Sequence, residues 1–368
     1  MSEFFTKRSF HDIFGNRKVI LGMIHMSGMN DVDRLERTMK ELDIYVESGV
    51  TGVIFENYHC GYSSLISTLE RLPLDKWRAK LIYGINVLPN EYEDALALAT
   101  QYKMDFIQLD YVSGKYSGGG SVIQLNIPKY NEARKKYPYP IVLGGVHPKY
   151  YHPAPGSHLF EDLQNAKDLC EAIVVTGTAT GSETPLSKIL QFRNMIGQEF
   201  PLIVGAGVTG QNIRGQLEVA NGCIIGSSFK PYGQTNQMIM KELVTPIMNI
   251  VNEFNNYELH KEEELEKHIL PSSTEPKEKD SVEPVLDRLS SAQNAARKAN
   301  FPDYLIPVLI SLLQDNESFQ FPWTCDDCQY FNDQVIANCK MCRNDNPNYD
   351  SEKASRLLTS QPNHLRFE

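Results

Sequence analysis

Eight short apolar runs, rich in β-branched residues and separated by stretches with helical spacing, constrain the fold most. They lie at residues 19–25, 52–57, 81–87, 105–111, 140–146, 172–177, 201–207 and 222–227. Most are apolar at consecutive positions, as expected of parallel strands that are buried on both faces. Eight strand–helix repeats within about 250 residues predict a closed (β/α)8 barrel of the TIM type. A doubly wound open sheet is the alternative, because periodicity does not distinguish a closed sheet from an open one.

The rest of the chain predicts small appendages to this barrel. The strand–helix pattern ends after a predicted helix at 236–257, so the barrel unit is expected to span residues 1–257. Residues 258–283 are rich in Glu, Lys, Pro and Ser, which predicts a disordered linker. Residues 284–318 predict two short helices that either pack on the barrel or form a docking module. A cysteine-rich module at 319–346 and a polar tail at 347–368 follow.

Four cysteines in the last module form two Cys-x-x-Cys pairs: Cys325, Cys328, Cys339 and Cys342. Two thiolates of each pair can bind one metal ion, and two pairs together make a tetrahedral sulfur site. Zinc is the expected metal, and its role structural, because four thiolates leave no open position for chemistry. The alternatives are a redox pair, a chance cluster or an iron–sulfur cluster, whose usual ferredoxin spacings are different.

The spacing around these cysteines resembles the Ran-binding-protein type (NZF) zinc finger, Trp-x-Cys-x2-Cys-x3-Asn-x6-Cys-x2-Cys, because Trp323 and Asn332 also match. Members of that family bind ubiquitin or single-stranded RNA. At the partner-binding positions of the ubiquitin binders, Tyr330 and Met341 keep an apolar patch, whereas Gln329 replaces the usual Thr. The resemblance favours a protein partner, with ubiquitin as the candidate, and leaves RNA as the less favoured one. Packing of these apolar residues on the preceding helices is the alternative.

Composition sets the broad class of the chain. Its 368 residues are 41% hydrophobic and 22% charged, as in ordinary soluble proteins, and no apolar run approaches the length of a membrane span. The other three cysteines, Cys60, Cys170 and Cys223, are scattered and suggest no disulfide framework. A cytoplasmic or nuclear location is therefore expected. The net charge of −10 argues against broad nucleic-acid binding.

The active site of a (β/α)8 barrel lies at the carboxyl ends of its strands. The polar residues predicted there are His25, Glu56, Asn86, Asp110, His147 and Lys149. Glu56 and Asp110, with the imidazoles, would provide a base, an acid or ligands for Mg²⁺. Lys149 would bind a phosphate or carbonyl oxygen. Each residue taken alone has a structural role as its simpler interpretation, but a ring of them around one mouth favours function.

Glycine-rich turns end the last two predicted strands, with Gly205 and Gly207 in one turn and Gly226 and Ser227 in the other. Without side chains, backbone N–H groups can converge on an anion, and a helix N-terminus adds to the attraction. These four residues therefore form the predicted phosphate site, since this fold commonly binds phosphate there. Tight turns without a ligand are the alternative.

The barrel sequence resembles the BtpA/SgcQ family over about residues 14–240. The matching segments are 14–18, 22–25, 52–57, 84–88, 173–181, 204–209 and 225–230. The resemblance implies a (β/α)8 barrel similar to those that bind phosphorylated sugars or nucleotides. The family's own reaction is poorly defined, and its name comes from a link to photosystem I assembly.

This sequence departs from the family pattern at three strand ends: residues 26–30, residues 58–60, and Gly145, where the family has an acidic residue. Two hypotheses follow. The barrel is either an enzyme that acts on a phosphorylated compound and is recruited by the zinc finger, or a catalytically inactive scaffold in a zinc-finger adaptor.

Overall fold

The computed structural model describes residues 8–118, 121–269, 323–324 and 331–332. Eight parallel strands lie in its core: β1 (Val19–Ile24), β2 (Gly52–Glu56), β3 (Ile82–Asn86), β4 (Phe106–Leu109), β7 (Ile141–Gly145), β9 (Ala172–Thr176), β10 (Leu202–Gly205) and β11 (Gly222–Ile225). They close into a barrel in the order β1-β11-β10-β9-β7-β4-β3-β2. Each predicted run contains one of these strands. The (β/α)8 barrel is therefore confirmed, and the open-sheet alternative is wrong.

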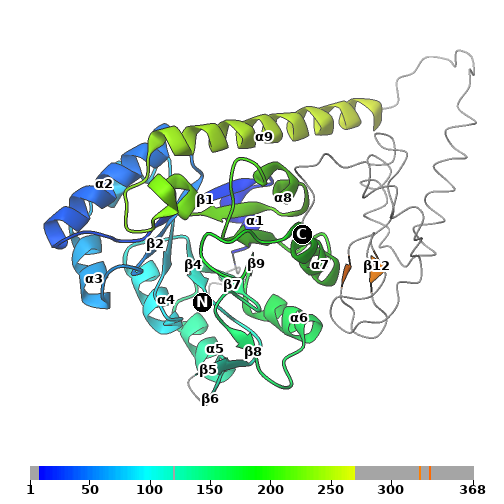
Figure 1. Cartoon of the computed structure of the whole chain (residues 1–368), viewed down its shortest axis with the longest axis horizontal. Coiled ribbons are helices and arrows are strands. Elements are labelled where there is room, and N and C mark those ends of the chain that lie inside the picture. Colours follow the sequence, from blue (N-terminus) through cyan, green and yellow to red (C-terminus); the bar gives the residue numbers. More distant parts are fainter. Residues whose placement is uncertain (1–7, 119–120, 270–322, 325–330, 333–368) are drawn as a thin grey trace, which may run out of the picture. The chain divides into compact units, whose positions relative to one another are not determined.

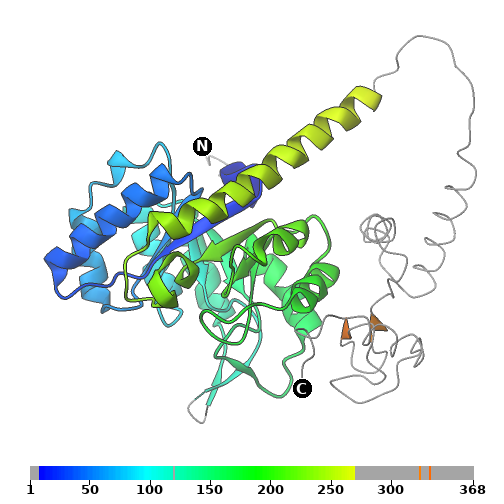
Figure 2. The ribbon, with the colours of Figure 1, turned by 45° about the horizontal axis from the view of Figure 1, so that its top comes forward.

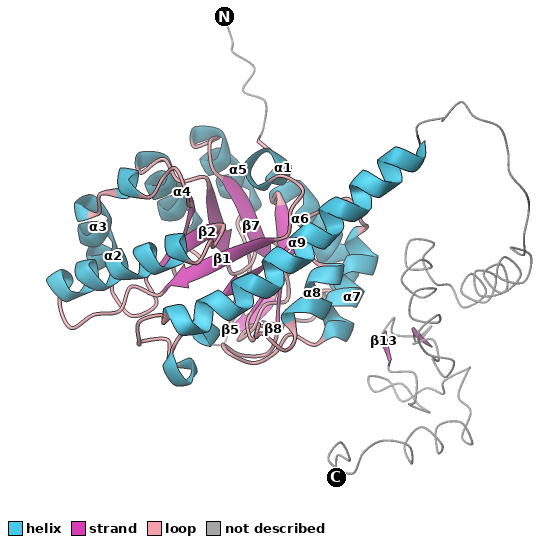
Figure 3. Cartoon of the chain, turned by 90° about the horizontal axis from the view of Figure 1, so that it is seen from above, coloured by secondary structure: helices cyan, strands magenta, loops and turns pink. Residues whose placement is uncertain are grey.

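Helices cover the outside of the barrel (Figure 3). They are α2 (Asp31–Glu47), α3 (Tyr62–Arg71), α4 (Tyr92–Gln101), α5 (Ile127–Lys136), α6 (Leu159–Leu169), α7 (Leu186–Ile196), α8 (Ile213–Val219) and α9 (Lys241–Ile269). Short 3-10 turns occur at η1 (Leu74–Lys76), η2 (Ser227–Phe229) and η3 (Pro231–Gly233). Within the described ranges, no helix combines the length and apolar character needed to cross a bilayer.

The apolar core has two layers, because alternate strand residues face opposite sides of a closed sheet. Val19, Leu21 and Met23 of β1 belong to the cluster inside the barrel, whereas Ile20 and Ile24 pack in the layer between strands and helices. The first helix, α1 (Phe10–Phe14), adds two buried phenylalanines to the inner cluster. Phe14 packs on Phe106, the first residue of β4, with ring centroids 5.7 Å apart, so α1 covers the amino-terminal end of the barrel and leaves the carboxyl ends for a site.

A small three-stranded sheet extends this carboxyl end. Its strands are β5 (Tyr116–Gly118), β6 (Ser121–Ile123) and β8 (His152–Pro153), in the order β6-β5-β8. The first two follow β4 and the third follows β7, so the sheet is built from neighbouring loops. Buried Tyr116 joins these loops, because its hydroxyl donates to the carbonyl of Ser113 at 2.6 Å and accepts from the His147 N–H at 3.1 Å.

Helix α9 runs past residue 257, where the sequence predicted the barrel unit to end (Figure 2). It continues to Ile269, into the predicted linker 258–283. The residues it adds are mostly Glu, Lys and Leu, which favour a helix and place Glu and Lys at helical spacing. A charged composition by itself therefore did not mark the end of regular structure.

The chain divides into two compact units, residues 1–270 and 271–368. In the second unit, β12 (Trp323–Thr324) pairs antiparallel with β13 (Phe331–Asn332) (Figure 1). The predicted zinc ligands Cys325, Cys328, Cys339 and Cys342 lie outside the described residues, as do Gln329, Tyr330, Met341 and the segments 284–318 and 347–368.

Candidate functional site at the carboxyl end of the barrel

A cavity of about 310 Å³ opens at the carboxyl ends of the barrel strands. All eight barrel residues predicted as catalytic or phosphate-binding line it: His25, Glu56, Asp110, Lys149, Gly205, Gly207, Gly226 and Ser227. They come from β1, β2, β4, β7, β10 and β11 or from the turns that follow these strands. Closure of the barrel therefore brings residues from the whole length of the domain to one cavity.

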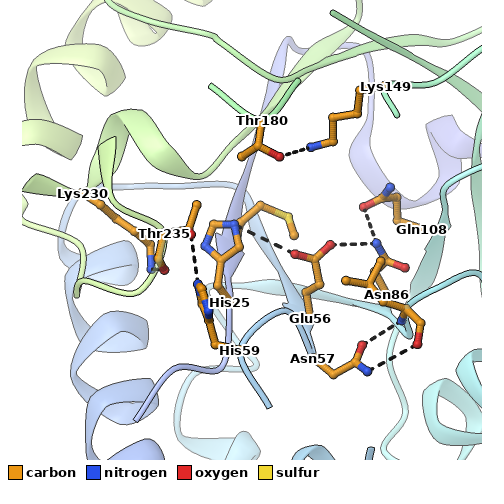
Figure 4. Close-up of polar contacts among 12 residues, drawn as sticks. His25, Glu56, Asn57, His59, Asn86, Gln108, Lys149, Thr180, Lys230 and Thr235 are labelled. Atoms are coloured by element: carbon orange, nitrogen blue, oxygen red, sulfur yellow. Dashed lines mark hydrogen bonds and ion pairs between the residues drawn. The ribbon is translucent and has the colours of Figure 1, made fainter. Parts of the chain in front are cut away.

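Glu56 is a buried carboxyl group of the site. It ends β2 opposite Asn86 of β3, and the residue is 7% exposed. The Asn86 amide donates to Glu56 Oε1 at 2.9 Å and to Gln108 Oε1 at 3.3 Å (Figure 4). Burial, with the nearby Asp110 charge, raises the pKa of Glu56 to about 7. Glu56 can therefore both hold and release a proton near neutral pH.

His25 lies beside this carboxyl group. Its Nε2 is 4.0 Å from Glu56 Oε2, and its Nδ1 has no hydrogen-bond partner among the described residues (Figure 4). Burial, assisted by the positive charge of Lys230, lowers the pKa of His25 well below its usual value, so the imidazole is neutral. Gly226 makes room for the ring, because a Cβ there would lie 2.7 Å from His25 Cε1.

Asp110 and Lys149 add opposite charges to the cavity. The Tyr151 hydroxyl donates to Asp110 Oδ2 at 3.2 Å, and burial raises the pKa of Asp110 although Lys149 opposes this rise. Lys149 Nζ donates to Thr180 Oγ1 at 2.9 Å (Figure 4). It makes no salt bridge to a carboxylate within the described part of the chain. This ammonium group is therefore available to an anionic ligand.

The two glycine-rich turns lie together on the same cavity. Gly207 has a φ of +63°, and a Cβ there would lie 2.3 Å from the backbone of Ser182, so a glycine is required. The Ser228 hydroxyl donates to the carbonyl of Val208, which ties one turn to the other. The backbone N–H groups of Gly207 and Ser227 donate to no acceptor among the described residues. Such free donors suit an anion.

His147 behaves differently from the sequence expectation. Its Nε2 lies 2.8 Å from Asp162 Oδ2, and the residue does not line the cavity. The Ser157 hydroxyl also donates to that carboxylate, so His147 belongs to a network that joins the loop after β7 to α6. His147 therefore stabilises the loop, whereas Lys149, two residues later, lines the cavity.

Two further polar residues of the cavity were not singled out from the sequence: Gln108 and Tyr151. Gln108 carried a signal, since it is the one polar residue of β4 (Phe106–Leu109). A polar side chain in a strand buried on both faces requires a polar surrounding. Tyr151 follows β7 by several residues, and no spacing rule places such a loop residue.

The donor set for a metal ion is limited. Among the residues that the structure describes, no three His, Cys, Asp or Glu side chains come together as a metal site. Glu56 and Asp110 line the cavity as two carboxyl groups. Mg²⁺ often uses one or two carboxylates together with substrate phosphates, so these two residues fit that pattern without forming a complete site.

The BtpA family profile matches residues 16–253. The chain belongs to the BtpA family. An uncharacterized protein of Caenorhabditis elegans, described as mitochondrial, is 28% identical over 274 residues, which cover 64% of this chain and 94% of the relative. The photosystem I biogenesis protein BtpA of Synechocystis is 25% identical over 245 residues, 61% of this chain and 85% of that protein.

Solved structures similar to this BtpA-family barrel have low sequence identity to it. Thiamine phosphate pyrophosphorylase from Pyrococcus furiosus has a TM-score of 0.45 and 12% identity, covering 65% of this chain and 96% of that one. Phosphoribosyl anthranilate isomerase from Thermus thermophilus has a TM-score of 0.42 and 12% identity, covering 64% and 99%.

Proposed function

We propose that the barrel binds a phosphorylated sugar or nucleotide in the cavity and that Glu56 transfers a proton to or from it. The observation that carries this proposal is the meeting of two kinds of group in one cavity of about 310 Å³. One kind is a buried carboxyl group with a pKa of about 7, and the other is a set of free anion-binding donors. Together they suit an anionic ligand that undergoes proton transfer.

The phosphate would bind at the turns formed by Gly205, Gly207, Gly226 and Ser227. Backbone N–H groups that donate to none of the described residues lie there, and the small residues allow close approach of an anion. Lys149 lines the same cavity with no carboxylate partner in the described ranges, so its charge is available for the phosphate.

The proton transfer would use Glu56 as general acid or base, because catalysis is most efficient when the pKa of the group lies near the working pH. Neutral His25, 4.0 Å from Glu56, would accept or donate a hydrogen bond at the reacting atom. Asp110 would hold the substrate with Lys149. Where Mg²⁺ binds, Glu56 and Asp110 are the carboxylates that would hold it, and the ion would supply charge neutralisation for the phosphate.

A second candidate function, a zinc-finger adaptor with an inactive barrel, has its own observation. A Cβ at Gly145 would lie 1.9 Å from the carbonyl oxygen of Asp110, so the acidic residue expected at this position from the family pattern does not fit this backbone. Trp323–Thr324 pairs with Phe331–Asn332, on either side of Cys325 and Cys328 in the sequence, and this pairing supports the predicted module.

In both functions the finger would hold Zn²⁺ through Cys325, Cys328, Cys339 and Cys342 and bind a protein through Gln329, Tyr330 and Met341. Ubiquitin is the proposed partner. The test is titration of the full chain into isotope-labelled ubiquitin, followed by NMR. Binding should be lost in the double variant Tyr330→Ala/Met341→Ala while zinc content is unchanged. Absence of any ubiquitin shift with the zinc-loaded chain would reject this partner.

The barrel proposal is tested by thermal unfolding of the full chain with phosphorylated sugars and nucleotides, with and without Mg²⁺. A ligand at 100 times its Kd stabilises the folded state by about 2.7 kcal/mol, which raises the midpoint by several degrees. Lys149→Met should weaken binding at least about tenfold. Glu56→Gln should keep the ligand-induced shift of the midpoint but no longer convert the bound compound. If no compound of the panel raises the midpoint, the zinc-finger adaptor is the remaining proposal.

A further inference from the structure

We infer, on the basis of the proposed phosphate site, that the end of the ligand away from the phosphate is a polyhydroxylated sugar and not a nucleobase. The cavity has two sides with opposite hydrogen-bonding character. The turns at Gly207 and Ser227 provide donors. The strand ends of β2, β3 and β4 provide carboxyl and amide groups instead.

The carboxyl and amide side is held in place by one buried residue. Asn86, fully buried at the end of β3, donates to Glu56 at 2.9 Å and to Gln108 at 3.3 Å (Figure 4). The glutamate and the glutamine therefore arise from the two strands that flank β3 and are fixed by the same amide group. Both line the cavity.

These two side chains keep hydrogen-bonding capacity for a ligand. Glu56 Oε2 is 4.0 Å from His25 Nε2, which is beyond hydrogen-bond distance, and Gln108 Nε2 donates to no described residue. A hydroxyl group both donates and accepts, so it can satisfy a carboxylate oxygen and an amide N–H at once. Nδ1 of His25, buried in the same wall, also lacks a partner among the described residues.

The remaining walls do not form a slot for a base. Tyr151 lines the cavity and packs edge to face on Tyr111, with ring centroids 5.3 Å apart. Tyr58 and His25, which also line it, pack edge to face on each other at 5.3 Å. Tyr150, at the rim, is 60% exposed. Bases stack on exposed aromatic faces in proteins that bind single-stranded nucleic acid. The inner walls contribute aliphatic side chains instead, from Met23, Leu109, Val174 and Ile224.

The size of the cavity agrees with a small ligand. Its volume of about 310 Å³ is at the lower end of the range of roughly 300–1,000 Å³ that is typical of ligand sites. A pentose or hexose phosphate places hydroxyl groups and phosphate at opposite ends of one small molecule, which matches the two sides of the cavity.

The test is calorimetric titration of the full chain with ribose 5-phosphate, glucose 6-phosphate, fructose 6-phosphate, AMP, UMP and inorganic phosphate. We expect one of the sugar phosphates to bind at least about tenfold tighter than inorganic phosphate and than either nucleotide. A nucleotide that binds tighter than every sugar phosphate, or binding of all phosphorylated compounds without preference, overturns the sugar assignment. If no compound binds, the phosphate site itself is rejected.

Two variants separate the sides of the cavity. Gln108→Leu keeps a similar volume and removes the hydrogen bonds, so it should weaken the best sugar phosphate about tenfold and leave inorganic phosphate unchanged. Lys149→Met, the control on the phosphate side, should weaken both by the same factor, because it removes the charge available to the phosphate. Equal effects of Gln108→Leu on both ligands would contradict the inference. Comparison of the best sugar phosphate with its deoxy analogues on the unmodified chain gives the same answer if Gln108→Leu does not fold.

Discussion

Replacement of Glu56 by Gln should change how the stability of the barrel depends on pH. In the folded protein the Glu56 carboxyl group keeps its proton up to a pKa of about 7, whereas in the unfolded chain it releases it near its ordinary value of 4.5. Between these two values the folded state binds more protons than the unfolded state. The free energy of unfolding therefore falls as pH rises through this window and levels off above it.

The size of this change follows from the two pKa values. Each pKa unit corresponds to about 1.4 kcal/mol, so the rise from 4.5 to about 7 corresponds to about 3 kcal/mol of stability lost between acid and neutral pH. Gln has a similar shape, can accept the same hydrogen bond from Asn86, and does not ionise. The difference in unfolding free energy, Glu56→Gln minus wild type, should therefore grow by about 3 kcal/mol from pH 4.5 to pH 7.5.

The assay is urea unfolding followed by circular dichroism at several pH values between 4.5 and 8. The exposed Glu93 provides the control, since Glu93→Gln removes a carboxyl group from the surface and should alter stability by no more than about 0.5 kcal/mol. A difference between Glu56→Gln and wild type that stays constant over the whole range would refute the reasoning, because burial would then not set the ionisation of Glu56.

Three further outcomes are expected. Cys325→Ser should abolish zinc binding, measured by metal analysis of the purified chain, while the thermal midpoint of the barrel is unchanged; a full zinc content would disprove the metal assignment. Lys230→Met should destabilise the barrel by about 3–5 kcal/mol, because it leaves Glu41, 5% exposed and 3.4 Å away, as an uncompensated buried acid. Adding Glu41→Gln should restore most of this loss in chemical denaturation, and no recovery would argue against the ion pair. Gly207→Ala should lower the free energy of unfolding by about 1–3 kcal/mol, because φ is +63° and a Cβ there would collide with backbone atoms. Gly215→Ala in α8, where a Cβ would have no atom within 4 Å, should raise it by about 0.5–1 kcal/mol. Similar effects of the two variants would contradict the steric argument.

Local sequence pattern was sufficient to predict the strands. Runs such as 172–177 and 222–227 are apolar at successive positions, and this pattern arises when both faces of a strand are covered. Their carboxyl ends are therefore known as soon as the strands are known. For this reason the sequence alone predicts Glu56, Lys149 and Gly207 at one mouth, although each lies on a different strand or turn.

The sequence pattern did not predict which of two neighbouring loop residues has its side chain in the cavity. His147 and Lys149 are separated by a single residue after β7, but His147 bonds to Asp162 outside the cavity while Lys149 reaches into it. His147 and Tyr150 both have positive φ, at 46° and 68°. At such positions neighbouring side chains point in different directions. Which direction each one takes depends on the contacts that the loop makes with other loops.

The sequence by itself therefore determined the eight strands and the residues at their ends, and it favoured a closed barrel over an open sheet. The tertiary structure alone decided the chemical state of those residues. The pKa of Glu56 depends on its burial and on Asp110, and the neutrality of His25 depends on its burial and on Lys230, which lies more than 200 positions along the chain. Desolvation and charge act through space, and these neighbours meet when the barrel closes.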